Sequence, residues 1–159
     1  MKNALQRVGF TLIELMIVVT IIACLSLLSI PSLMRMVAKA KRAEAYLYLR
    51  TLAQAQKVYF AEHGHYCARL SGPDSLDWKP EGPCTYTYGF SGSRQGVGHY
   101  SGSSGAPSSA LGATHASRTS FCVAAAGYIY GDTPDVLTIN EQGVLTQVSD
   151  ALSSVLKDQ

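Results

Sequence analysis

The feature that most constrains this chain is an uncharged apolar run from Leu15 to Met34. Extended back to Phe10, the run contains a single charge, Glu14. As a helix, the run from Leu15 to Met34 alone measures about 30 Å, which is the thickness of a bilayer's hydrocarbon core. The sequence therefore predicts a transmembrane helix over residues 10–34, followed by a more polar, water-exposed remainder.

The helix is expected to continue well beyond the apolar run. Residues 35–62 contain neither glycine nor proline. Apolar or large residues recur on one face at helical spacing, namely Ala45, Leu49, Leu52, Gln56 and Tyr59. This pattern predicts an amphipathic second half of the same helix, with one face covered by a sheet. Pro31 removes a backbone donor inside the helix and predicts a kink there.

Residues 63–159 read as an outer β domain. Its Pro-rich start offers Leu70, Leu76 and Trp78 as anchors onto the core. Alternation and β-branched composition predict strands at 84–90, 120–126, 136–140 and 144–148. A short turn containing Gly143 joins the last two strands. Segment 91–117 is rich in Gly and Ser and predicts an exposed, mobile loop. The expected fold class is α+β: a long helix packed on a four-stranded antiparallel sheet.

Charge and motif content exclude several function classes. The chain has 13 Lys and Arg against 11 Asp and Glu, and the first nine residues carry two of the basic ones, so no basic nucleic-acid surface is expected. The basic residues after the apolar run predict a solvated helix face; they are Arg35, Lys39, Lys41 and Arg42. His63 and His65 are interpreted as exposed loop residues. The sequence predicts no enzyme, no catalytic residue, no cofactor and no metal site.

The four cysteines divide into one membrane residue and three in the outer domain. Cys24 lies inside the apolar run and is interpreted as a small buried apolar residue. Cys67, Cys84 and Cys122 allow one disulfide, for which three pairings are open. We favour Cys67–Cys84, which would close the Pro-rich loop between them, with Cys84–Cys122 as the alternative.

The residues Gly9-Phe10-Thr11-Leu12-Ile13-Glu14-Leu15 resemble the processing site of type IV prepilins and of type II secretion pseudopilins. The resemblance implies the pilin fold and a leader, residues 1–9, that is cleaved off. It implies that an inner-membrane prepilin peptidase cuts between Gly9 and Phe10 and methylates the new Phe10 amine. It also implies that Glu14 meets the Phe10 amine of a neighbouring subunit and fixes the filament register. A carboxylate beside lipid is costly and therefore tends to be functional.

The implied function is that of a structural subunit, a major or minor pilin of a type IV pilus that serves adhesion, twitching motility or DNA uptake. The implied partners are further copies of the chain, other pilins, the prepilin peptidase, the inner-membrane assembly platform and, before assembly, membrane lipid. The precursor is expected in the inner membrane with a cytoplasmic N-terminus and a periplasmic C-terminal domain. The product is expected in an extracellular pilus or a periplasmic pseudopilus, so a type II secretion pseudopilin is the alternative within the family.

Two observations favour other interpretations. Five basic residues lie within residues 35–50 against two before the apolar run, which by the positive-inside rule favours the reverse orientation. Ile21-Ile22-Ala23-Cys24 also passes as a lipoprotein signal, with Cys24 as the lipid anchor. Glu14 within the apolar core argues against such a signal, and so does the apolar continuation from Leu25 to Ile30.

Overall fold

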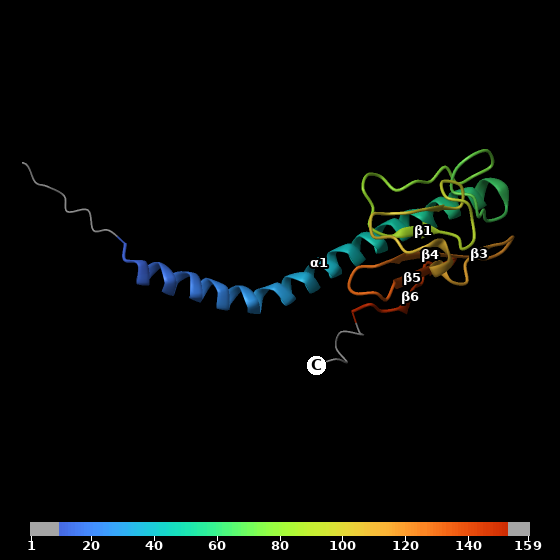
Figure 1. Cartoon of the computed structure of the whole chain (residues 1–159). Coiled ribbons are helices and arrows are strands. Elements are labelled where there is room, and N and C mark those ends of the chain that lie inside the picture. Colours follow the sequence, from blue (N-terminus) through green and yellow to red (C-terminus); the bar gives the residue numbers. More distant parts are fainter. Residues whose placement is uncertain (1–9, 153–159) are drawn as a thin grey trace, which may run out of the picture. The chain divides into compact units, whose positions relative to one another are not determined.

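The computed structural model describes residues 10–152, apart from the side chain of Pro31. These residues belong to two compact units that divide after Met36 (Figure 1). Helix α1 (Leu12–His63) belongs to the first unit as far as Met36 and to the second unit from Val37 onward. The predicted helix, 10–62, is confirmed, although it begins two residues later than expected.

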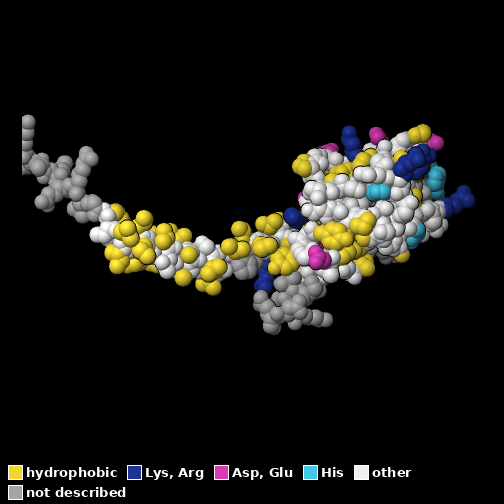
Figure 2. Space-filling model, viewed as in Figure 1, with side chains coloured by type: hydrophobic (Ala, Val, Ile, Leu, Met, Phe, Trp, Pro, Cys, Tyr) yellow, Lys and Arg dark blue, Asp and Glu magenta, His cyan; other side chains and the backbone are white. Residues whose placement is uncertain are grey.

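In the first unit, α1 is a single helix whose large apolar side chains are all exposed. Figure 2 shows these side chains in yellow along the segment. Three hydroxyl groups, among them those of Thr20 and Ser26, bond back to the helix itself: Thr20 Oγ1 donates to the Met16 carbonyl (2.7 Å) and Ser26 Oγ to the Ile22 carbonyl (2.8 Å). These hydroxyl donors are therefore satisfied within the helix and add little polarity to its apolar surface.

In the second unit, the predicted apolar stripe of α1 is buried. All five of its residues are between 0% and 7% exposed: Ala45, Leu49, Leu52, Gln56 and Tyr59. The helix ends where Gly64 takes a positive φ of 72° and its N–H bonds to the Phe60 carbonyl (2.8 Å). A left-handed glycine after the last turn is a common helix stop. The expected amphipathic half of the helix, with one buried face, is confirmed.

Within residues 10–152 the sheet has six strands, so the prediction of four was too few. The predicted strands correspond to β1 (Thr87–Gly89), β4 (Phe121–Gly127), β5 (Asp135–Asn140) and β6 (Leu145–Ser149). Short strands β2 (His99–Tyr100) and β3 (His115–Ala116) add to them. The order is β2-β1-β4-β5-β6, with β3 also paired to β4, and every pair is antiparallel. The four predicted strands do form the expected meander.

The two faces of the sheet carry separate hydrophobic cores. The larger core packs the α1 stripe against alternate residues of β4 and β5, among them Val123, Leu137 and Ile139. The smaller core lies on the other face, where Ala124 and Val136 contact Leu111 of the short 3-10 helix η1 (Ser108–Leu111). Both faces of the central strands are thus covered, which explains why β4 is apolar throughout instead of alternating.

The Gly/Ser-rich segment 91–117 is not the fully exposed loop that its composition predicts. It contains β2, η1 and β3, and it buries His99, Ala106 and Leu111. Gly102 lies so close to the backbone of residues 84–86 that a Cβ at this position would overlap it. The small residues that we interpreted as linker therefore let the segment lie directly on the sheet.

Candidate functional site

Helix α1 begins with a capped first turn. Thr11 precedes the helix, and its Oγ1 accepts a hydrogen bond from the Glu14 N–H (3.3 Å). Thr11 is thus the N-cap residue and Glu14 occupies the third helical position, the spacing of a capping box. The carboxylate also lies in the first turn, where the helix dipole stabilises negative charge. The Thr-x-x-Glu spacing is the local sequence signal of this cap.

The structure describes only some of the other residues of the predicted processing site. Phe10 lies just before the helix and is 78% exposed. Glu14 is exposed as well. Gly9 and the rest of the leader lie outside the described residues. The structure therefore leaves cleavage at Gly9 and methylation of Phe10 as predictions, while it places Phe10 and Glu14 on an accessible helix end.

The helix that follows is long and apolar enough to cross a membrane. Its most apolar window has no residue buried within the chain. Exposed apolar area this extensive is a mark of contact with lipid or another protein. Pro31 lies inside α1, which continues through it as one helix. The kink that we expected at Pro31 remains a prediction.

The cysteines are all free thiols in this structure. Gln56 bonds to the backbone of Cys67, and Glu44 bonds to Thr85, the residue after Cys84. Those two helix positions lie about 18 Å apart along α1. The favoured Cys67–Cys84 disulfide stays a prediction.

The alternative pairing, Cys84–Cys122, stays a prediction as well. Cys122 lies opposite His115 and Asn140 in the sheet, at the other end of β4 from Ala126, the partner of Thr87. Burial, and secondarily the nearby Glu44 carboxylate, raises the pKa of the Cys84 thiol, and burial does the same for the pKa of Cys122. A raised pKa disfavours the reactive thiolate. Peptide mapping without reductant remains the test of any pairing.

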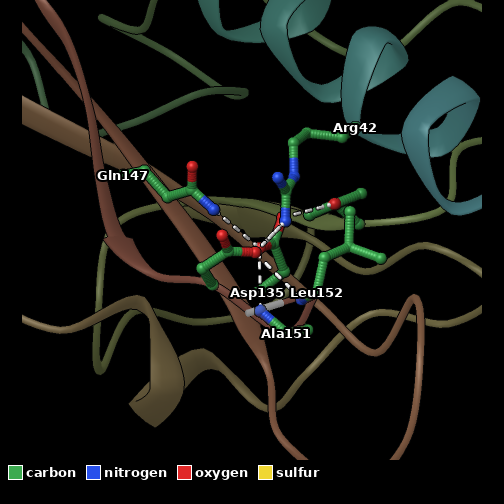
Figure 3. A network of polar contacts seen from close by, with 7 residues as sticks. Arg42, Asp135, Gln147, Ala151 and Leu152 are labelled. Carbon is green, nitrogen blue, oxygen red and sulfur yellow. Dashed lines mark hydrogen bonds and ion pairs between the residues drawn. The ribbon is translucent and has the colours of Figure 1, made fainter. Parts of the chain in front are cut away.

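One ion-pair network joins α1 to the sheet in the second unit (Figure 3). Arg42 donates from Nε and Nη2 to the two carboxylate oxygens of Asp135 (3.1 and 2.7 Å), and Nη2 also donates to the Asp150 carboxylate (2.6 Å). Asp135 is fully buried. Its carboxylate also accepts from the Tyr86 hydroxyl (2.8 Å), the Gln147 amide and the Ala151 N–H. A buried carboxylate with this many donors is well compensated.

The network corrects part of the sequence interpretation. Lys39 is exposed, as the expected solvated face requires, but Arg42 is partly buried and paired. Burial lowers the pKa of the Arg42 guanidinium, but the hydrogen bonds and charges of Asp135 and Asp150 outweigh this and raise it overall. Burial and then the bond to Asp135 raise the pKa of Tyr86. Arg42 is thus held as a cation between two carboxylates.

Two further polar residues of α1 form hydrogen bonds to loops of the second unit. Gln56 is fully buried and bonds to both the N–H (3.1 Å) and the carbonyl (2.5 Å) of Cys67. Glu44 accepts from the Thr85 N–H (2.8 Å) and hydroxyl (3.0 Å). We had placed Gln56 on the buried face without predicting its partner. Among residues 10–152, no group of three His, Cys, Asp or Glu side chains gathers as a metal site.

Comparisons with known proteins agree with the N-terminal features. The prokaryotic N-terminal methylation motif matches residues 9–30. The type IV major pilin protein PilA of Myxococcus xanthus is 35% identical over 135 residues, which is 85% of this chain and 60% of that pilin. The type IV major pilin protein PilE of Neisseria gonorrhoeae is 40% identical over 62 residues, which is 39% of this chain and 36% of the pilin.

A secretion protein is similar as well. The type II secretion system core protein G of Escherichia coli is 36% identical over 83 residues, which is 52% of this chain and 57% of that protein. The chain thus spans 60% or less of the length of each of these relatives. The structure has three features beside these similarities. The helix start is capped and preceded by an exposed phenylalanine, the apolar part of the helix is uncovered, and a sheet packs on its second half. The chain thus carries the prokaryotic N-terminal methylation motif, and it is similar to type IV major pilins and to a core protein of a type II secretion system.

Proposed function

We propose that this chain is a structural subunit of a type IV pilus, which assembles through the apolar part of α1. One observation carries the proposal: the methylation motif stands at the start of a helix whose large apolar side chains are all exposed from Leu12 to Met36. Such a surface is unstable in water and needs lipid or apolar neighbours to cover it. Membrane lipid covers this surface before assembly, and other pilin subunits cover it afterwards.

The proposed maturation follows from the motif. A prepilin peptidase cleaves between Gly9 and Phe10 and methylates the Phe10 amine. Phe10 supports this role because it is exposed and precedes the first helical turn. In the filament, the Glu14 carboxylate pairs with the Phe10 amine of a neighbouring subunit. Glu14 is suited to the pairing because it too is exposed, in that same first turn.

The role is that of a building block and involves no catalysis. The precursor stands in the inner membrane with its outer domain in the periplasm, and the assembly platform transfers it to the growing filament. Its partners there are copies of itself and other pilins. Adhesion, twitching motility and DNA uptake are the activities that such a pilus would serve.

A type II secretion pseudopilin is the second candidate. The similarity to core protein G, which extends over 83 residues and so beyond the N-terminal motif, favours it. Electron microscopy of sheared cell-surface filaments separates the two candidates. Surface filaments that contain the chain support the pilus, whereas a chain confined to the periplasm supports the pseudopilus.

Mass spectrometry of the mature N-terminus tests the proposal most directly. We expect a chain that begins with N-methylated Phe10 and has lost the leader. A Gly9→Val variant should keep the leader, because a β-branched residue at the scissile bond prevents the backbone from lying against the peptidase. An N-terminal Cys24 carrying acyl chains would instead identify a lipoprotein, and processed protein of normal mass from Gly9→Val would refute the cleavage site.

A further inference from the structure

Two histidines at the C-terminal end of α1 have the same ring nitrogen engaged. Nδ1 of His63 lies 3.2 Å from the Tyr59 carbonyl oxygen, and Nδ1 of His65 lies 3.0 Å from the His63 carbonyl oxygen. A carbonyl oxygen can only accept a hydrogen bond, so Nδ1 carries the proton in both rings. In the neutral rings, each Nε2 therefore has a free lone pair.

This arrangement is the one that metal-ligating histidines adopt. A ligating imidazole usually donates its other N–H to a carbonyl or carboxylate, which fixes the tautomer and orients the ring. Here the backbone of residues 59–63 provides both acceptors. Both histidines are exposed, so an ion in solution can reach them.

The imidazole rings of His63 and His65 both contact the aromatic ring of Tyr59. The Tyr59 ring is buried; His63 stacks on it with centroids 4.1 Å apart, and His65 meets it edge-on at 5.5 Å. The centroids of the two imidazoles are 6.2 Å apart. A metal about 2.1 Å from each Nε2 lies about 3.2 Å from each centroid, and a tetrahedral angle between the two ligands places the centroids about 5.2 Å apart. The two exposed rings would therefore approach each other by about 1 Å on binding one ion.

We propose that His63 and His65 form a two-histidine site for a borderline divalent transition metal such as Zn²⁺ or Cu²⁺. Imidazole ligands suit these ions, whereas Ca²⁺ and Mg²⁺ require oxygen ligands. Water completes the coordination, since the described residues provide no third ligand of the His, Cys, Asp or Glu type. The Glu62 carboxylate, 4.0 Å from Nδ1 of His63, adds negative charge nearby. The proposal is independent of filament assembly.

The test is a titration of the full-length chain, free of any histidine tag, in detergent micelles. Isothermal titration calorimetry with ZnCl₂ should show one ion per chain, and CaCl₂ should show no binding. Loss of an outer-shell partner alone costs about 10–100-fold in metal affinity, so His63→Gln and His65→Gln should each weaken Zn²⁺ binding at least tenfold. With Cu²⁺, electron paramagnetic resonance should show coupling to two nitrogens, reduced to one in either variant.

His115→Gln is the matched control, because His115 is also exposed but lies in β3. It should leave the Zn²⁺ affinity unchanged. Fluorescence of Trp78, the single tryptophan of the chain, verifies that each variant is folded. The proposal is overturned if the wild type binds no Zn²⁺, if the two site variants bind as well as the wild type, or if His115→Gln weakens binding equally.

Discussion

Leu28 and Leu49 belong to the same helix, but Leu28 is 78% exposed and Leu49 is fully buried. From Leu12 to Met36 the large apolar side chains are exposed, whereas in the second unit the apolar stripe is covered by the sheet. The same type of side chain occurs in both, so burial depends on the partner that the fold provides. The first unit has none in the described chain and needs one from outside.

The polar residues of the two units differ in a related way. In the first unit, the hydroxyls of Thr20 and Ser26 bond to carbonyls one turn earlier in the same helix. In the second unit, Arg42, Glu44 and Gln56 bond to strands and loops outside the helix. The first pattern needs no tertiary structure, while the second holds a tertiary structure together.

The largest expected effect concerns the uncovered unit. Glu14→Ala should abolish filaments while leaving membrane insertion and cleavage largely intact. It removes the acceptor for a neighbour's Phe10 amine, and an amine left unpaired in an apolar filament core costs about 3 kcal/mol or more per contact. Glu14→Gln should be nearly as harmful, since it keeps the shape and loses the charge. The measurement compares processed protein with filament yield.

Thr11→Val separates this role from the cap. The variant loses the hydrogen bond to the Glu14 N–H, which costs about 1 kcal/mol at the helix start, but it keeps the carboxylate. Its filament yield should stay close to that of the wild type. Two results would refute the pairing of Glu14 with Phe10. One is normal filament assembly by Glu14→Ala, and the other is a loss of filaments in Thr11→Val as complete as the loss in Glu14→Ala.

The second prediction concerns the covered unit. Arg42→Met should lower the free energy of unfolding of the second unit by about 3–5 kcal/mol, because it leaves the Asp135 carboxylate buried without its cation. Denaturant unfolding of the chain in detergent, followed by Trp78 fluorescence, gives the value. Arg50→Met changes an exposed arginine of the same helix and should cost less than about 0.5 kcal/mol. Equal losses for the two variants would show that the ion pair contributes no more than surface charge.

The third prediction compares two leucines. Leu49→Ala should lower the free energy of unfolding of the second unit by about 3 kcal/mol, because it removes buried apolar volume. Leu28→Ala should leave that free energy unchanged in detergent, because the exposed leucine lies in the first unit. The same Trp78 measurement applies to both variants. A destabilisation of the second unit by Leu28→Ala would contradict the division of the helix into a covered and an uncovered part.

Much of this architecture can be predicted from local sequence patterns. The membrane-length helix, its buried stripe from Ala45 to Tyr59, the stop at Gly64 and the β5–β6 hairpin all follow from periodicity and turn residues. Each of these features depends on residues only a few positions apart in the sequence, so the spacing of residue types indicates the local structure directly. The capping contact between Thr11 and Glu14 belongs to the same class, and we overlooked it.

The remaining features depend on residues that are far apart in the sequence. Arg42 and Asp135 are 93 positions apart, and no local pattern distinguishes an arginine that pairs with a buried carboxylate from one that faces water. Strands β2 and β3 and the turn η1 lie in a Gly/Ser-rich segment of low β-propensity. Strand β2 pairs with β1 and strand β3 with β4. Helix η1 is ordered because the opposite face of β4 and β5 is apolar and needs a cover, which Ala106 and Leu111 provide. Local composition determines where the chain can form a helix or strand, but the apolar and charged surfaces that meet only after folding decide which loops become ordered and which charges are paired.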